Sequence, residues 1–159
     1  MSVQFRNMSL LAARPMKAPY VAAERALRWR ANHTSHPCPV RGGWAEARML
    51  VGAIDGDSWP WTCIDLGSPA PYFQVLGTAE QCLLEVGLPT PGRTVYRTGT
   101  GSNEWVGMPA GCVWWVGAIR NDETFTTTEA FDVGRRWLLT LSLADGYALR
   151  ATHPTPHRN

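Results

Sequence analysis

A chain of 159 residues is long enough to bury a hydrophobic core without help from a metal ion or a disulfide. Apolar residues make up 45% of the chain and charged residues 18%, which excludes an intrinsically disordered protein. The net charge is +2, and it is unevenly spread, because residues 1–50 hold eight Lys or Arg and two acids.

The segments that direct a protein to a membrane or out of the cell are not visible in this sequence. No stretch approaches the ~20 apolar residues that a membrane-spanning helix needs, and no secretory signal is seen. The four cysteines form no CxxC pair, which suits a reducing compartment. We therefore expect a cytoplasmic protein without membrane contact. Residues 1–23 hold three bases and no acid, so an organelle transit peptide stays open as an alternative.

In the first half of the chain, the patterns predict a helix followed by strands. The run AERALRWR is rich in helix formers and predicts a helix that ends near Asn32. Residues 47–54 read as a strand, joined by an Asp-Gly turn to a return strand over 59–66. Residues 72–76 predict a third strand. The run TAEQ, which follows at 78–81, fits a capping box, so we expect a short helix over 79–86.

The second half predicts further strands and one long helix. Residues 112–119 are the most apolar run and are expected to form a central strand. A second capping box, formed by Thr126 and Glu129, predicts a helix from about 129 to 143. The other expected strands cover residues 93–98, 105–106 and 147–151.

The order of these elements predicts an α+β fold with one domain over residues 1–159. We expect a curved, mainly antiparallel sheet of five to seven strands, with two or three helices packed on it. Residues 1–15 would be a loose arm and residues 152–159 a frayed tail.

A metal site is the first chemistry to consider. His33, His36 and Cys38 lie close together and are of the types that bind Zn²⁺, but a tetrahedral site needs about four ligands and only three are local. We expect a polar turn and no bound metal, although the sequence leaves metal binding by these three residues open.

A weak enzyme pattern is also present. Arg97, Thr127 and Glu129 are similar to part of an ADP-ribosyltransferase site, in which an Arg holds the dinucleotide and a Glu polarises the ribose. Thr127 stands where the second acid of such a site belongs. A small enzyme based on Arg97 and Glu129 is therefore one alternative function.

The basic first third offers a second alternative. Arg25, Arg28 and Arg30, together with Trp29, could contact a nucleic acid through the basic predicted N-terminal helix. The basic excess is small for such a role, so we do not expect nucleic acid as the partner.

Residues 47–151 resemble the Imm1-type immunity proteins of bacterial polymorphic toxin systems. The run VWWVGAIRNDETF is similar to the aromatic strand and Glu–Phe loop of that family. The runs FDVGRRWLLTLS and DGYALRA are similar to its helix and last strand, and RMLVGAIDGD to its first hairpin. The resemblance implies a small α+β inhibitor that binds a cognate toxin domain, often a nucleic-acid deaminase, and covers its active site.

Such an inhibitor needs neither catalytic residues nor a cofactor, and we expect none here. The loop after the aromatic strand is expected to be exposed and to lie at the interface, where acidic side chains would complement a basic groove. Buried aromatics carry most interface energy, so Phe125 or Trp105 would be the anchor. The predicted partner-binding residues are Asn121, Asp122, Glu123, Phe125 and Trp105.

Overall fold

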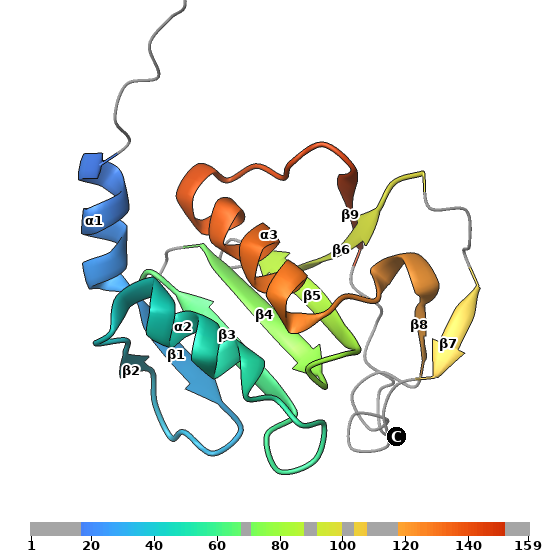
Figure 1. The fold of residues 1–159 in the computed structure, drawn as a ribbon, viewed down its shortest axis with the longest axis horizontal. Coiled ribbons are helices and arrows are strands. Elements are labelled where there is room, and N and C mark those ends of the chain that lie inside the picture. The colour runs from blue at the N-terminus through green and yellow to red at the C-terminus, as the bar shows by residue number, and fades with distance from the viewer. Residues whose placement is uncertain (1–16, 68–70, 88–91, 100–103, 108–117, 152–159) are drawn as a thin grey trace, which may run out of the picture.

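The α+β fold is confirmed by a computed structural model that describes residues 17–67, 71–87, 92–99, 104–107 and 118–151. A seven-stranded sheet has the order β2-β1-β3-β4-β5-β6-β9, and β7 and β8 form a separate pair (Figure 1). All neighbouring strands are antiparallel. The helical elements are α1 (Lys17–Ala26), α2 (Gly43–Gly52), the short 3-10 turn η2 (Asn121–Glu123) and α3 (Thr127–Thr140). The strands are β1 (Arg28–Ala31), β2 (Cys38–Pro39), β3 (Trp61–Asp65), β4 (Tyr72–Gly77), β5 (Cys82–Gly87), β6 (Arg93–Arg97), β7 (Trp105–Gly107), β8 (Ala118–Arg120) and β9 (Tyr147–Ala151).

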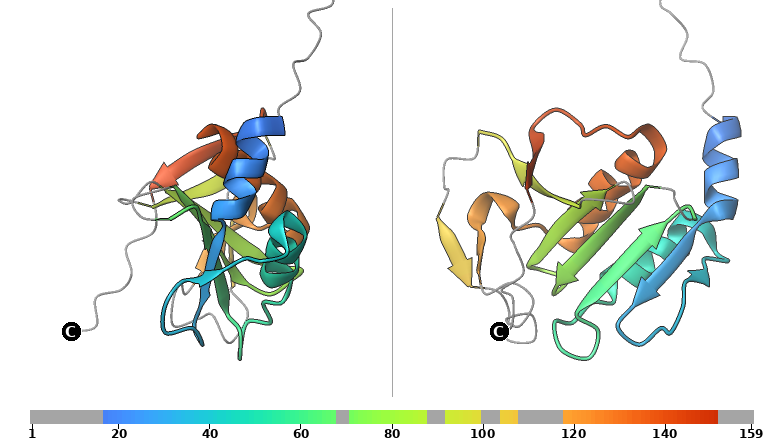
Figure 2. Two further views of the ribbon diagram at one scale, coloured as in Figure 1. Left: turned by 90° about the vertical axis from the view of Figure 1, so that its left-hand side faces the viewer. Right: turned by 180° about the vertical axis from the view of Figure 1, so that it is seen from behind.

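Helices α2 and α3 lie side by side on one face of the large sheet (Figure 1). The main hydrophobic core fills the space between this face and the two helices, with Phe73, Leu84 and Phe131 among its fully buried members. The right-hand view of Figure 2 shows the opposite face, which no helix of the described ranges covers. We call this second surface of the sheet the open face.

The prediction of a strand over residues 47–54 is wrong, because the chain forms helix α2 there. Its buried residues Trp44, Ala47 and Val51 recur at intervals of three and four, which is helical spacing and places them together against the core. The prediction considered only the apolar run that begins at Ala47. A short apolar run fits a strand and a buried helix equally well, and the preceding Trp44 decides between them.

Two predicted helical segments are strands. The helix at the N-terminus ends at Ala26, and Arg28–Ala31 form β1. The helix predicted over 79–86 is replaced by a tight turn and β5. The Thr78 hydroxyl accepts a hydrogen bond from the Gln81 backbone N–H at 3.2 Å, as a helix cap would, but the chain then turns back to pair with β4. The same hydroxyl contact occurs in helix caps and in turns, so it does not separate them.

The remaining strand and helix predictions agree with the structure, apart from the apolar run 112–119, whereas the predicted arm over 1–15 and tail over 152–159 lie outside the described residues. Strands β3, β4, β6, β7 and β9 stand where they were predicted, and α3 begins after Thr126, whose hydroxyl accepts from the Glu129 N–H. Of the run 112–119, only residues 118–119 lie within the described ranges. They belong to β8, which pairs with β7 outside the large sheet, so the central position predicted for that strand is wrong for its described part.

The β7–β8 pair packs on one end of the open face. Ile119 of β8 forms a small second core with Leu76 and Leu83, whose side chains alternate with those of the main core. Trp61 and Val106 complete this cluster as partly buried members. The chain therefore crosses from the open face at Ile119 to the helix-covered face at α3, and residues 120–126 make that crossing.

The fold predicts opposite effects for two helical glycines. A Cβ at Gly134 would lie 2.5 Å from the Phe73 ring, whereas a Cβ at Gly52 would have nothing within 4 Å. Gly134→Ala should lower the free energy of unfolding by about 1–3 kcal/mol through overpacking, despite its better helix propensity. Gly52→Ala should raise it by up to about 1 kcal/mol. Urea unfolding of both variants tests this, and equal effects at the two positions would contradict the packing of α3 on β4.

Candidate functional site

The acidic loop predicted to be exposed is largely buried. Asp122 is 9% exposed, Glu123 is 0% exposed and Phe125 is 1% exposed. These three side chains were expected at a docking interface, and that expectation of exposure is wrong. Of the loop residues named as partner-binding, Asn121 is exposed.

The two buried carboxylates are held by Arg150 of β9. Its Nη1 lies 2.6 Å from Glu123 Oε1, and its Nη2 lies 3.0 Å from Asp122 Oδ2. The backbone N–H of Arg120 also donates to Glu123 Oε2 at 3.0 Å. A carboxylate removed from water is stable when it is paired and hydrogen-bonded, and Glu123 meets both conditions. This triad fixes η2 against the last strand.

Phe125 occupies a place next to β5 that β6 leaves empty. Strands β5 and β6 pair only at Glu85–Thr94 and Val86–Arg93, and then diverge. Beside the start of β5, Phe125 exchanges two backbone hydrogen bonds of 2.8 Å with Cys82. Its ring packs in the main core. Phe125 is thus a core residue that closes the gap between the two strands.

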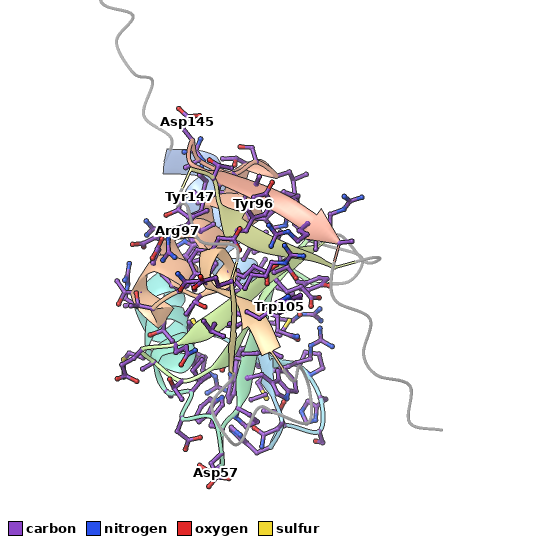
Figure 3. The ribbon with its side chains drawn as sticks, turned by 90° about the vertical axis from the view of Figure 1, so that its right-hand side faces the viewer. Asp57, Tyr96, Arg97, Trp105, Asp145 and Tyr147 are labelled. Carbon is purple, nitrogen blue, oxygen red and sulfur yellow. The ribbon has the colours of Figure 1, made fainter. Side chains whose placement is uncertain are left out.

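The structure brings Arg97 and Glu129, the predicted enzyme pair, together. Arg97 Nε donates to Glu129 Oε1 at 2.9 Å, its Nη2 pairs with Glu129 Oε2, and the Tyr147 hydroxyl donates to Oε1 at 2.9 Å. Figure 3 shows Arg97 and Tyr147 on the side of β6 and β9 that faces α3, with Tyr96 on the other side. Burial acts to raise the pKa of the Glu129 carboxyl, but the hydrogen bonds from Arg97 and Tyr147 outweigh it and lower that pKa.

This arrangement holds the Arg97 guanidinium within the protein. Besides Glu129, it donates to the Thr124 carbonyl oxygen at 2.6 Å and lies 4.5 Å above the Phe125 ring. Thr127, the third residue of the enzyme pattern, is buried. A dinucleotide would have to displace Glu129 from Arg97 before it could bind there, so the geometry favours a structural role for this pair.

Trp105 is a predicted partner-binding residue that the structure leaves exposed. It begins β7, and 56% of its surface is accessible. The Arg120 guanidinium of the paired strand lies 5.0 Å from the centre of its ring, which restrains the indole. Trp105 and Asn121 therefore lie at the surface of the molecule, beside the end of the open face (Figure 3).

The open face itself carries a polar row that the sequence did not reveal. The strand register places one side chain of each of six strands in line across it. The alternation of side chains turns all of them away from α2 and α3. From β1 to β9, this row is Arg30, Cys63, Gln74, Glu85, Thr94 and Arg150.

A carboxylate without a cation lies in the middle of this row. Glu85 accepts a hydrogen bond from the Tyr72 hydroxyl at 2.9 Å, and no described Lys, Arg or His lies within ion-pair distance of it. Burial raises the pKa of the Glu85 carboxyl above its ordinary value of 4.5. The sequence carries a signal for this site, because Glu85 interrupts the apolar run CLLEV. The capping-box pattern before this run favours a helix, which hides the signal.

The metal pattern does not assemble in the structure. His33 packs edge-on against Trp59 with 4.4 Å between ring centres, and the His36 ring lies within hydrogen-bond distance of Ser35. Cys38 donates weakly to the His36 carbonyl oxygen. Within the ranges that the structure describes, no group of three or more His, Cys, Asp or Glu is placed to hold a metal ion.

The basic surface predicted for nucleic acid is divided between two faces. Arg28 and Arg30 of β1 point to the open face, and Trp29 between them points to the main core. Arg28 is paired with Asp65 of β3 at 2.8 Å. Trp29 therefore does not share a surface with Arg28 and Arg30.

Comparison with known proteins gave no relative. No family model matches the chain, and no curated protein or solved structure matches it significantly. No helix of the described residues is long and apolar enough to cross a membrane. The structure itself therefore describes the chain, as an α+β protein whose sheet has one helix-covered face and one polar open face.

Proposed function

We propose that this chain is an immunity-type inhibitor, which binds a bacterial toxin domain and covers its active site. The observation that carries the proposal is the open face with Trp105 beside it. The strands present Arg30, Tyr72 and Arg150 on this face. Tyr, Trp and Arg are the residue types that contribute most to the energy of protein interfaces.

The framework behind this surface suits a binding role. Seven hydrogen-bonded strands hold the side chains of the open face at fixed spacings, so few of them need to be ordered when a partner binds. The Arg150 triad joins the segment that follows the β7–β8 pair to the edge strand β9. A surface organised before binding loses less entropy in the complex.

The contact residues differ from those that the sequence indicated. Asp122, Glu123 and Phe125 support the surface from inside, and the two carboxylates are paired with Arg150 of the same chain. Trp105 and Asn121 remain as direct contacts, with Trp105 as the proposed anchor. The proposal therefore moves the interface from the acidic loop to the β7–β8 pair and the adjoining open face.

The test is binding to the purified product of the adjacent gene, measured by calorimetry. Trp105→Ala should raise the dissociation constant about 30-fold, which corresponds to the ~2 kcal/mol of an aromatic hot spot. Met49→Ala is the matched control, because Met49 is 74% exposed but lies on α2, on the other side of the sheet. It should change the dissociation constant less than twofold.

Cells that express the adjacent gene's product give a second readout. The wild-type chain should restore their growth, and Trp105→Ala should restore it less well at equal expression. No complex and no rescue with the wild-type chain would contradict the proposed function. A complex that Trp105→Ala leaves intact would contradict the proposed anchor.

A further inference from the structure

Three neighbouring side chains on the open face have unused hydrogen-bonding capacity. Gln74 of β4, Glu85 of β5 and Thr94 of β6 stand opposite one another in the strand register. Within the described ranges, the Gln74 amide and Glu85 Oε2 make no hydrogen bond, and the buried Thr94 hydroxyl has no partner. Polar groups withdrawn from water are normally paired, so this cluster is incomplete in the free protein.

Each of the other carboxylates around this row is in contact with an arginine. Asp65 is paired with Arg28, while Asp122 and Glu123 are both paired with Arg150. Among the described residues, Glu85 has only the Tyr72 hydroxyl as a partner, although its surroundings withdraw it partly from water. An unpaired carboxylate in such a place lowers stability unless a cation arrives from outside.

Two glycines fix the position of this carboxylate. A Cβ at Gly87 would lie 2.7 Å from the Tyr72 ring, and a Cβ at Gly92 would collide with the Glu85 carboxylate. The ring and the carboxylate therefore lie directly over the backbone of these two residues. Because the Tyr72 hydroxyl holds Oε1, the other oxygen, Oε2, is left for a ligand.

We propose that Gln74 and Glu85, with Tyr72 beside them, form a receptor for an arginine side chain of the partner protein. This inference rests on the proposed function and names the chemistry that the open face recognises. A guanidinium has five N–H donors in a planar fork, which fits a carboxylate oxygen and an amide oxygen on neighbouring strands. Its flat face also suits the Tyr72 ring.

The charges at the two ends of the row do not oppose this ligand. Arg30 lies next to Asp65, with 3.8 Å between Nε and Oδ2, although Arg28 shares that carboxylate, and Arg150 is paired with both Asp122 and Glu123. With Glu85 included, these three arginines and four carboxylates carry a net negative charge. A toxin that acts on nucleic acid carries basic residues in its substrate groove, so an arginine is available on such a partner.

The decisive variant is Glu85→Gln, which removes the charge and keeps an oxygen for the Tyr72 hydroxyl. It should weaken binding to the adjacent gene's product at least tenfold, and it should raise the Tm of the free protein by about 2–4 °C at pH 7. A purely structural role of Glu85 predicts the opposite shift in Tm. The matched control is Glu80→Gln, which removes an exposed acid from the β4–β5 turn. It should change neither the dissociation constant nor the Tm.

A small probe tests the receptor without the partner. N-acetyl-arginine-N-methylamide, titrated in the millimolar range, should shift the backbone amide NMR signals of Gln74, Glu85 and Thr94. The citrulline analogue has the same shape and no charge, and should not shift them. Equal shifts with both compounds, or arginine shifts that survive in Glu85→Gln, would overturn the receptor.

The pH dependence follows from the raised pKa of Glu85. Because the pKa of Glu85 is raised in the folded protein, the folded protein binds this proton more tightly than the unfolded chain does. The charge of Glu85 therefore lowers stability only as the pH rises above about 4.5, the ordinary pKa of the group. The gain in Tm from Glu85→Gln should therefore vanish near pH 4. Binding of the arginine probe should be lost over the same range, because the carboxylate becomes neutral.

The two proposals fail in different ways. If the adjacent gene's product binds and Glu85→Gln changes neither its affinity nor the Tm, the receptor is wrong and the inhibitor function stands. If no complex forms but the arginine probe binds through Glu85, the receptor stands and the proposed function is wrong. A lower Tm in Glu85→Gln would also overturn the receptor, since it would show that Glu85 stabilises the free fold.

Discussion

Replacing Arg150 with Met should lower the free energy of unfolding by about 3–5 kcal/mol, because the variant leaves a buried carboxylate without its cation. Glu123 is 0% exposed, and the Arg150 guanidinium lies 2.6 Å from its Oε1. Methionine keeps much of the aliphatic volume of arginine, so the lost charge dominates the effect. Guanidinium chloride unfolding, followed by tryptophan fluorescence, measures the change.

A second variant separates the charge from the rest of the side chain. Glu123→Gln in the Arg150→Met background removes the unpaired charge and should recover at least half of the lost stability. Arg136→Met is the matched control, because Arg136 is exposed on α3 and should cost less than about 0.5 kcal/mol. A loss below about 1 kcal/mol for Arg150→Met would mean that Glu123 is neutralised in another way.

The fold class could be predicted because several elements carry two agreeing signals. Helix α3 combines an amphipathic pattern with the Thr126 cap, and β3 and β4 combine apolar runs with clear turns. Such local agreement is enough to fix the type of an element. The α+β class then followed from the order of the elements.

The errors fall where a short segment carries one ambiguous signal. Residues 47–54 are apolar enough for a strand, and only Trp44 and the contact of α2 with α3 make them helical. The segment 28–31 has good helix formers, but alternation of Arg28 and Arg30 with Trp29 and Ala31 suits a strand that turns one face to the core. In both cases the packing against distant residues overrides local preference.

The candidate site could not be predicted, because it depends on the strand register. Glu85 and Thr94 are nine positions apart, and Arg150 stands much further along the chain, but pairing of β5, β6 and β9 places them in line. A shift of one residue would turn any of them to the other face. Burial of the acidic loop was hidden for a similar reason, since Glu123 and Arg150 are 27 positions apart.

Replacing Phe125 with Ala should lower the free energy of unfolding by about 3–5 kcal/mol, which is the range for a large aromatic removed from a core. The Phe125 ring is 1% exposed, with the Arg97 guanidinium 4.5 Å from its centre and the centre of the Tyr147 ring 6.2 Å away. This experiment decides between two roles, since an interface anchor would cost binding and leave stability intact. Phe125→Leu, which keeps most of the volume, should cost about half as much. If Phe125→Ala unfolds at the wild-type denaturant concentration but no longer binds the partner, the acidic loop is not buried and forms the docking surface.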